Sequence, residues 1–507
     1  MVRYSLLQRP AMSAWSFVPR QIRTIFVFAV VVFVVFLITA QSSRNAKFAE
    51  LHILQGTVVD IFDLEIKYIS ASRSGNRDTW FPTGVPEGHV YSAYVDIRPE
   101  VILGYRHQNS KWEQTWAEIR IIAILPLDRA DLPLTCHYKY RTRGSETEIR
   151  SRLAAKIKAI GEHWDLEYAA FFVLCDLTLS MDLNYETLYH RSHLPVSVSL
   201  GEANKDYGKP DLVPFVDINY PKRRISRISD FDKFLAVCMP VLHNTYDEPL
   251  RLIEFFEYYS MMGAEQFMVY NSSVSERVNR VLEVYASRGT ATVMQWQLPD
   301  IYEYEKTLRG EGDYAALNDC FYRSSFHEGY EYVAHVGVGD FIVPRVHKNL
   351  KEMMFYLDPH RSKGLRNQYA AFVFRNVFYT MYDDVSPRDP KSPYLVSQAK
   401  TTRRRKFDEA GIGSRYIVRS KDAIELGKYS VQEFRRGVSM FSRSYDELVV
   451  DPDLALTHRY SGCEAEETGC YLKPTTIDET APKFSKKLEQ RVTETCGIVF
   501  GTSSCTP

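Results

Sequence analysis

The chain has 507 residues, which is more than one hydrophobic core usually holds and predicts at least two domains. Hydrophobic residues make up 45% and charged residues 25%, which are the proportions of a globular protein. The 63 basic and 63 acidic residues give a formal net charge of zero, so the composition argues against a nucleic-acid partner.

Residues 24–40 (TIFVFAVVVFVVFLITA) are uncharged and apolar, and they predict a transmembrane signal anchor. As a helix this segment would span roughly 25 Å, close to the ER membrane thickness of about 27 Å. The positive-inside rule predicts residues 1–23 as a cytoplasmic tail and the rest as lumenal, in a single-pass type II protein. A cleaved signal peptide is the alternative, because residues 39–41 leave room for a cleavage site. The basic residues that precede the segment are Arg3, Arg9, Arg20 and Arg23.

All 8 cysteines follow residue 40, and an even number on one side of the anchor predicts an oxidising compartment. The preferred disulfide pairs are Cys136–Cys175 and Cys463–Cys470, followed by Cys238–Cys320 and Cys496–Cys505. Asn271, in the sequence Asn-Ser-Ser, is a glycosylation acceptor.

The sequence of the first half of the lumenal part predicts β-strands and no helices. Residues 41–89 are polar and predict a stem, and residues 90–220 predict a β-rich domain. Its expected strands are 90–97, 117–125, 134–140 and 169–177. Because Cys136 and Cys175 fall inside two of them, we expect one disulfide between two strands of a sandwich.

Strands and amphipathic helices alternate after a charged linker at 206–230. The expected strands are 234–240, 266–270, 290–296 and 330–338, and the expected helices are 248–262, 275–288 and 314–326. This alternation predicts a parallel α/β sheet that binds ligands at the carboxyl edge of its strands. Residues 243–244, Asn271 and 337–340 lie at that edge.

Six segments between residues 234 and 463 carry a family resemblance: FLAVCMPVLHN (234–244), GDYAALNDCFYR (312–323), DFIVP (340–344), AAFVFRNVFY (370–379), SRYIVRSKDAIELG (414–427) and LTHRYSGC (456–463). Together, and in this order, they resemble glycosyltransferase family 92. The resemblance implies a GT-A fold over residues 231–465, with a mostly parallel sheet flanked by helices and a C-terminal tail at 466–507. It also implies Golgi residence and transfer of a hexose, usually galactose from UDP-galactose, to a glycan acceptor with inversion. A manganese ion is the expected cofactor, and a homodimer is one expected assembly.

The expected metal motif is missing from its place in the sequence. GT-A transferases carry Asp-x-Asp where the strand 330–338 ends, and two such carboxylates hold a divalent cation. This chain has Gly337-Val338-Gly339 there, which predicts little or no manganese dependence. An inactive glycan-binding paralogue and a metal-independent transferase are both consistent with that change. In the second, Arg375, His458 or the basic run 403–406 would stabilise the leaving diphosphate.

The remaining acidic and polar residues of these motifs are the site candidates. Asp340 and Asp319 are the candidate catalytic bases. Asp340, His458 and Asp313 are the candidate metal ligands. The candidate donor-binding residues are Asn318, Arg375, Asn376 and His458, with Gly337 and Gly339 allowing close backbone approach to a diphosphate. For each of these a structural role is the alternative: a turn glycine, a capping aspartate, or a buried hydrogen-bonding side chain.

Overall fold

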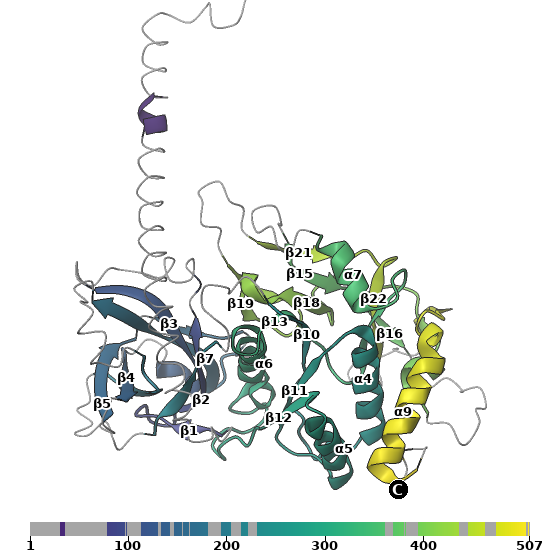
Figure 1. Ribbon diagram of the computed structural model, residues 1–507, viewed down its shortest axis with the longest axis horizontal. Coiled ribbons are helices and arrows are strands. Elements are labelled where there is room, and N and C mark those ends of the chain that lie inside the picture. Colours follow the sequence, from purple (N-terminus) through teal and green to yellow (C-terminus); the bar gives the residue numbers. More distant parts are fainter. Residues whose placement is uncertain are drawn as a thin grey trace, which may run out of the picture.

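The computed structural model shows two adjoining units (Figure 1). A β-rich domain comes first, and a mixed α/β domain follows from residue 231. The residues that the structure describes are 31–35, 79–96, 98, 113–129, 133–141, 147–154, 156–161, 163–180, 194–203, 214–221, 231–359, 369–379, 381, 394–435, 445–461, 473–502 and 505.

The predicted transmembrane helix at 24–40 is corrected by the structure. Residues 31–35 are described as helix, and the rest of this segment lies outside the described residues. Among the described residues, no helix is both long enough and apolar enough to span a membrane.

The β-rich domain is a nine-stranded sheet with the order β5-β4-β8-β9-β2-β3-β7-β6, and β1 pairs with β2. The sheet folds back on itself, because Cys136 on β4 forms a disulfide with Cys175 on β7 across the intervening strands. Apolar side chains such as Ile119, Phe171 and Val198 fill the space inside the fold. The strands are β1 Phe81–Pro82, β2 His89–Asp96, β3 Glu113–Pro126, β4 Leu134–Arg141, β5 Thr147–Leu153, β6 Lys156–Ala159, β7 Tyr168–Ser180, β8 Ser197–Glu202 and β9 Val216–Asn219.

The α/β domain is built on a seven-stranded sheet with the order β12-β11-β10-β13-β18-β15-β21. Strands β12, β11, β10 and β13 are parallel to one another, β18 runs antiparallel to both β13 and β15, and β15 pairs in parallel with β21. The sheet is therefore mixed, and the predicted fold class of a mostly parallel sheet is corrected by its antiparallel part at β18. The strands are β10 Lys233–Cys238, β11 Gln266–Asn271, β12 Ala291–Gln295, β13 Tyr330–His335, β15 Tyr369–Phe374, β18 Arg415–Arg419 and β21 Asp446–Val449.

A second, five-stranded sheet has the order β14-β22-β16-β17-β23, and most of its pairings are antiparallel. Parallel neighbours need a crossover connection, usually a helix, and the strand–helix alternation ends after β13. The later strands therefore join mixed and antiparallel sheets. The strands are β14 Asp340–Pro344, β16 Asn376–Tyr379, β17 Thr402–Arg404, β22 Ala455–Tyr460 and β23 Thr475–Ile477, with a separate hairpin of β19 Ala423–Leu426 and β20 Val431–Phe434.

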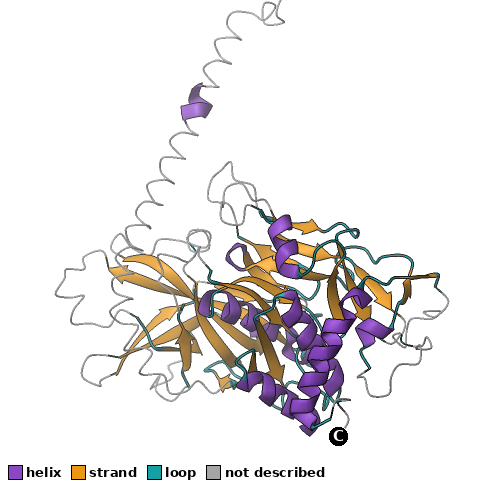
Figure 2. Ribbon diagram, turned by 45° about the vertical axis from the view of Figure 1, so that its right-hand side comes forward, coloured by secondary structure: helices purple, strands orange, loops and turns teal. Residues whose placement is uncertain are grey.

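Helices cover the central sheet on both faces (Figure 2). Helices α4, α5 and α9 share one apolar core, and α6 packs on the other face, between the sheet and the β-rich domain (Figure 1). Helix α9 lies in the segment predicted as a tail and is held to α4 by an ion pair of 2.7 Å between Arg491 and Glu257. The helices are α4 Pro249–Met262, α5 Glu276–Ser287, α6 Asp313–Tyr322, α7 Leu350–Leu357, α8 Val396–Ala399 and α9 Ser485–Phe500, with short turns of helix at Leu127–Arg129, Arg309–Gly312, Arg323–His327, Ser420–Asp422 and Ala481–Phe484.

The two domains share one apolar core, so they pack directly against each other and are not separate units joined by a linker. Ile122 and Phe172 of the β-rich sheet belong to the same apolar cluster as Met268 and Phe321 of the α/β domain. Trp80 packs on Trp296 with the ring centroids 4.9 Å apart, and other aromatic residues surround the pair. Burial of large aromatic side chains at this junction stabilises the arrangement of both domains together.

Candidate functional site

A cavity of about 330 Å³ opens at the carboxyl ends of β10 and β13. Its walls come from the segment after β10, the start of α4, the turn after β13 and the end of β22. The lining residues are Pro240, Val241, Leu242, His243, Tyr246, Glu248, Arg251, Val338, Gly339, Asp340, Arg459, Tyr460 and Ser461.

The cavity lies at the topological switch point of the central sheet. From β10 the chain continues outward to β11 and β12 on one side, whereas β13 pairs with the other side of β10. Loops after two such strands diverge and leave a crevice, which is the usual ligand site of an open α/β sheet. The sequence predicted this edge correctly for His243 and for Gly339–Asp340, which line the cavity.

Gly339 is required by the packing of the turn after β13. A Cβ atom at this position would lie 2.9 Å from the backbone oxygen of Tyr460, closer than atoms can approach without a backbone shift. The Tyr460 amide also donates to the Gly339 carbonyl at 2.9 Å. At Gly337, a Cβ atom would lie 3.0 Å from the carboxylate of Asp340. Gly339 therefore has no room for an aspartate without a backbone shift, whereas a side chain at Gly337 would require a small shift of the Asp340 carboxylate.

Asp340 is buried at the base of the cavity and is engaged by Arg415. The guanidinium of Arg415 donates to Oδ2 of Asp340 from Nε at 2.7 Å, and its second nitrogen lies at 2.6 Å. The two side chains come from β14 and β18, in different sheets. An arginine that neutralises a carboxylate competes with a metal ion for the same oxygen. Asp340 is therefore a poor ligand and a poor base in this arrangement.

Two arginines, Arg251 and Arg459, line the cavity together with the carboxylates of Glu248 and Asp340. Arg251, on the first turn of α4, donates to the Tyr460 carbonyl at 2.6 Å and to Glu248 at 3.2 Å. Arg459, on β22, follows buried His458 and is half-buried. Guanidinium groups match the geometry of phosphate oxygens through paired N–H donors. The wall can therefore accept an anionic group such as a diphosphate.

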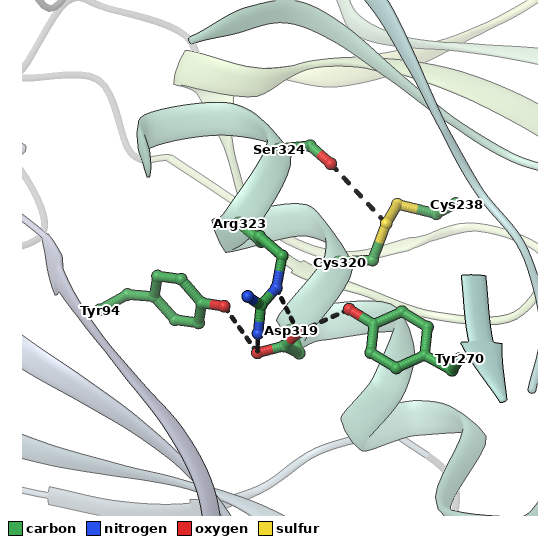
Figure 3. The surroundings of a disulfide bond; sticks show 7 residues. All are labelled: Tyr94, Cys238, Tyr270, Asp319, Cys320, Arg323 and Ser324. Carbon is green, nitrogen blue, oxygen red and sulfur yellow. Dashed lines mark hydrogen bonds and ion pairs between the residues drawn. A yellow bond between two sulfur atoms is a disulfide. The ribbon is translucent and has the colours of Figure 1, made fainter. Parts of the chain in front are cut away.

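Asp319 lies in the junction between the two domains, away from the cavity lining (Figure 3). Its carboxylate accepts hydrogen bonds from the hydroxyls of Tyr94 at 2.7 Å and Tyr270 at 2.5 Å, and from Nε of Arg323 at 3.0 Å. Tyr94 belongs to β2 of the β-rich domain. The buried carboxylate is saturated with donors from three elements, and we assign it a structural role.

Asn318, the neighbour of Asp319, also has its side chain fully used. Its amide nitrogen donates to the carbonyls of Tyr314 and Leu426, and its oxygen accepts from the Leu426 amide at 2.9 Å. The side chain thus ties α6 to β19. The poor helix propensity of Asn and Asp at these two positions is explained by these long-range bonds and not by contact with a donor.

His458 is a buried histidine between two tyrosines. Its ring nitrogens face the hydroxyls of Tyr379 at 3.4 Å and Tyr460 at 3.3 Å, and the side chain is fully buried. Burial lowers its pKa to about 3, so the ring is neutral at physiological pH. Adjacent residues of a strand point to opposite faces, so Arg459 lines the cavity and His458 does not.

The other predicted donor-binding side chains lie outside the cavity lining. Arg375 donates to the Asp408 carbonyl at 2.9 Å, and Asn376 donates to the Asp408 carboxylate at 2.8 Å. In the basic run 403–406, Arg403 pairs with Asp478 at 2.8 Å and Arg404 stacks over Phe378. These contacts hold the second sheet together.

Asp313, at the start of α6, adjoins the cavity through a hydrogen bond to a lining residue. Its Oδ1 accepts a hydrogen bond of 3.1 Å from the amide of Val241, a lining residue. Burial raises the pKa of its carboxyl group above the ordinary value, although the Val241 amide, Lys428 and His243 act in the opposite direction. A carboxylate with a raised pKa, close to a ligand cavity, has the properties of a general base.

The residues around the cavity do not fit a manganese ion. Within the described ranges, no group of three or more His, Cys, Asp or Glu side chains is placed to hold a metal. Where the family motif would supply two carboxylates, Gly339 leaves no space for a side chain and Asp340 is paired with Arg415. The lining carboxylates Glu248 and Asp340 are already ion-paired with Arg251 and Arg415.

The cysteine pairs coincide with those expected wherever they are described. Disulfides join Cys136 to Cys175, Cys238 to Cys320 and Cys496 to Cys505, whereas Cys463 and Cys470 lie outside the described residues. The Cys238–Cys320 bond fastens the end of β10, beside the cavity, to α6 (Figure 3). Asn271 ends β11 with a half-buried side chain, and its glycosylation stays a prediction.

Two buried histidines predict acid-sensitive folding. Burial lowers the pKa of both His335 and His458 to about 3, from about 6.5 in an unfolded chain. Between these values the unfolded state binds the extra proton, so each histidine should remove about 1.4 kcal/mol of stability per pH unit as the pH falls. Urea unfolding at pH 7 and pH 5 measures this dependence of stability on pH. In the His458→Phe variant, the loss of stability per pH unit should be smaller by the contribution of one histidine. Equal slopes for the variant and the natural chain would contradict the assignment.

Sequence reasoning passed over two of the residues that matter here. Arg251 lies on the first turn of the helix that directly follows the first strand of the sheet, and this position in the sequence could have indicated a residue of the ligand site. Arg459 was visible as the cation beside His458. Asp313 was considered only as a metal ligand.

A family model for glycosyltransferase family 92 matches residues 233–496. No curated protein matches the chain. Among solved structures, the chain is similar to S. aureus TarS 1–349, with 14% identity over 37% of this chain and 47% of that one, at a TM-score of 0.21. It is also similar to glucosyl-3-phosphoglycerate synthase from Mycobacterium tuberculosis, with 13% identity over 31% and 49% of the two chains, at a TM-score of 0.18.

The chain spans about half the length of these solved structures, and similarity at this level carries no argument about chemistry. The family match stands independently of them. It includes every residue that lines the cavity. Residues 233–496 also make up more than half of the 507 residues, and the chain belongs to glycosyltransferase family 92.

Proposed function

We propose that the protein transfers a hexose, galactose from UDP-galactose, to a hydroxyl group of a glycan with inversion, and that it does so without a metal ion. The observation that carries the proposal is the cavity at the switch point between β10 and β13, walled by Arg251 and Arg459 where the family would place a metal clamp. Family membership supports the reaction class. The sugar and the nucleotide are taken from the family pattern.

The two arginines stabilise the leaving group in this proposal. When the bond between C1 of the sugar and the diphosphate oxygen breaks, the electron pair stays on the diphosphate. Preorganised N–H donors at that position stabilise the developing charge more strongly than water does. Arg251 is held by Glu248 and by the Tyr460 carbonyl, so its guanidinium is already oriented along the wall.

Asp313 is the base that we propose for the acceptor. The acceptor hydroxyl attacks C1 from the face opposite the diphosphate, its proton passes to the Asp313 carboxylate, and the configuration at C1 inverts. The raised pKa of Asp313 suits this step, because proton transfer is most effective when the pKa of the base approaches the operating pH. The Val241 amide orients the carboxylate through its other oxygen.

A nucleotide-sugar-binding protein without transferase activity is the second candidate. It is favoured by the engagement of Asp340 with Arg415 and of Asp319 with two tyrosines, because both expected bases are occupied. The two candidates agree on UDP binding and differ in turnover.

Disulfides in both domains support the proposal that the protein works in an oxidising compartment, the lumen of the Golgi or of the ER. The expected homodimer stays a prediction.

Calorimetry with UDP tests the donor site. The natural chain should bind UDP equally well in EDTA and in manganese, within about two-fold. Arg459→Ala should weaken binding and lower turnover of UDP-galactose by about a hundred- to thousand-fold, because one preorganised stabiliser is lost. Arg405→Ala is the matched control, since Arg405 is an exposed arginine outside the cavity lining.

Three outcomes separate the alternatives. Strong manganese-dependent binding would show that metal ligands exist elsewhere and would overturn the metal-free mechanism. Binding of UDP without transfer or hydrolysis of UDP-galactose would favour the second candidate, a nucleotide-sugar-binding protein without transferase activity. Loss of binding in the Arg405→Ala control, with Arg459→Ala unaffected, would place the diphosphate on the basic run at 403–406.

A further inference from the structure

Exposed aromatic side chains from both domains lie at the loop that carries Tyr304 and Arg309, and this loop reaches the cavity lining through Tyr304. Trp164, from the β-rich domain, is 62% exposed, and Tyr304, from the α/β domain, is 47% exposed. The Tyr304 ring lies 5.2 Å from the ring of His243, which lines the cavity. Arg309 stacks over the Trp164 ring, with Cζ 3.5 Å from the centroid, and forms an ion pair with Glu305. Trp164, Tyr304 and Arg309 are called the aromatic platform below.

The platform is held rigidly across the domain boundary. The Tyr168 amide of β7 donates to the Thr307 carbonyl at 2.9 Å, and Tyr168 also forms a β-bridge with Leu308. From the same loop, Tyr302 donates to the Glu87 carbonyl at 2.7 Å. The loop that carries Tyr304 and Arg309 is thus fastened to the domain that carries Trp164. Neither domain alone would present the complete surface.

The backbone around the platform adopts an unusual conformation. Trp164 has a φ of 54°, as does Asp165, and Glu305 and Glu311 have φ values of 55° and 52°. A left-handed conformation is strained for a bulky residue such as tryptophan, and it persists only where the surrounding structure imposes it. Here it leaves a large indole ring in water, where folding gains little from it. Strain combined with exposure indicates a binding role for Trp164.

The platform also adjoins the proposed base. Gly310 follows Arg309 in the chain, and a Cβ atom at Gly310 would lie 3.5 Å from Oδ2 of Asp313. The loop that carries Tyr304 and Arg309 therefore adjoins Asp313, and the Tyr304 ring lies beside His243 of the cavity lining. Rigid aromatic rings offer a flat apolar area that suits the C–H face of a pyranose ring, and the neighbouring polar groups suit its hydroxyls.

We propose that the aromatic platform binds the acceptor, a glycan whose terminal pyranose ring stacks on Trp164 and Tyr304, so that the β-rich domain supplies part of the acceptor site. This inference rests on the proposed transfer reaction for its orientation, because the stacked sugar must present a hydroxyl to Asp313. Binding of the sugar itself does not depend on the donor cavity.

Saturation-transfer NMR on the full chain tests the proposal, with the methyl β-glycosides of galactose, glucose and mannose as probes. We expect saturation of ring C–H protons by the natural chain, with binding weakened about two- to ten-fold in Trp164→Ala and in Tyr304→Ala. Tyr356→Ala is the matched control. Tyr356 is 62% exposed and stacks on His347 with centroids 5.1 Å apart, but it lies on α7, outside the cavity lining.

UDP calorimetry on the same variants separates this proposal from the proposed function. Both platform variants should bind UDP as the natural chain does, and Trp164→Phe and Tyr304→Phe should retain most of the glycoside binding. If the natural chain fails to bind UDP but its glycoside binding is lost in Trp164→Ala, the reaction is wrong and the platform stands. The proposal is overturned if no probe shows saturation with the natural chain, or if Tyr356→Ala weakens binding as much as Trp164→Ala.

Discussion

Replacing Asp313 with asparagine is expected to lower the kcat for sugar transfer by about 10²- to 10⁴-fold, with UDP binding unchanged. Asparagine has the same shape and keeps an oxygen that can accept the hydrogen bond from the Val241 amide, so the cavity wall should stay in place. It cannot take the proton of the acceptor hydroxyl. The loss should therefore appear in kcat and not in the calorimetric dissociation constant for UDP.

The pH dependence of turnover gives a second measurement of the same residue. A base must be deprotonated to act, so activity of the natural chain should fall as the pH drops through the pKa of Asp313. Because burial raises that pKa, the fall should come at a higher pH than for an exposed aspartate, whose pKa is about 3.9. This decrease in activity at low pH should be absent from the Asp313→Asn variant.

Glu311→Gln is the matched control for this prediction. Glu311 lies on the same turn, and its carboxylate accepts a hydrogen bond from Ser272 at 3.2 Å. It should retain most of the activity. Turnover that is unaffected in Asp313→Asn, or reduced to the same degree in both variants, would exclude Asp313 as the base.

Replacing Asp319 with alanine is expected to destabilise the protein by about 3–5 kcal/mol, because the substitution breaks a buried ion pair by removing the carboxylate that faces Arg323. The Arg323 side chain is 12% exposed, so the penalty is only slightly relieved by water. The hydroxyls of Tyr94 and Tyr270 would lose their acceptor as well. Urea unfolding followed by tryptophan fluorescence measures the change.

Tyr94→Phe tests the same junction from the other domain. It removes one hydrogen bond to a charged group and should lower the free energy of unfolding by about 1.5–3 kcal/mol. Tyr140→Phe, another buried tyrosine of the β-rich sheet, is a comparison that leaves the junction intact. If Asp319→Ala unfolds at the same urea concentration as the natural chain but no longer transfers sugar, Asp319 is catalytic and the structural assignment is wrong.

The sequence by itself determined the local elements and the family. Apolar residues at i, i+3, i+4 and i+7 predicted the buried face of α4, where Leu252, Phe255, Phe256 and Tyr259 are buried. The alternation of strands and helices from 234 to 338 predicted the parallel part of the sheet and the edge at which the cavity opens. These features depend on neighbours within a few turns of the chain, and residue periodicity records them directly.

The tertiary structure decided which polar residues reach the cavity and which stabilise the fold. Asp340 meets Arg415, 75 residues away, and Asp319 meets Tyr94, 225 residues away. The partner of a buried charge is set by how the strands pair and how the domains dock, and local sequence does not encode either. The antiparallel β18 and the close approach of Tyr460 to Gly339 have the same origin. The sequence motifs therefore located the cavity. Only the long-range contacts showed that Arg251, Arg459 and Asp313 lie at the cavity, whereas other polar residues of the same motifs have structural roles.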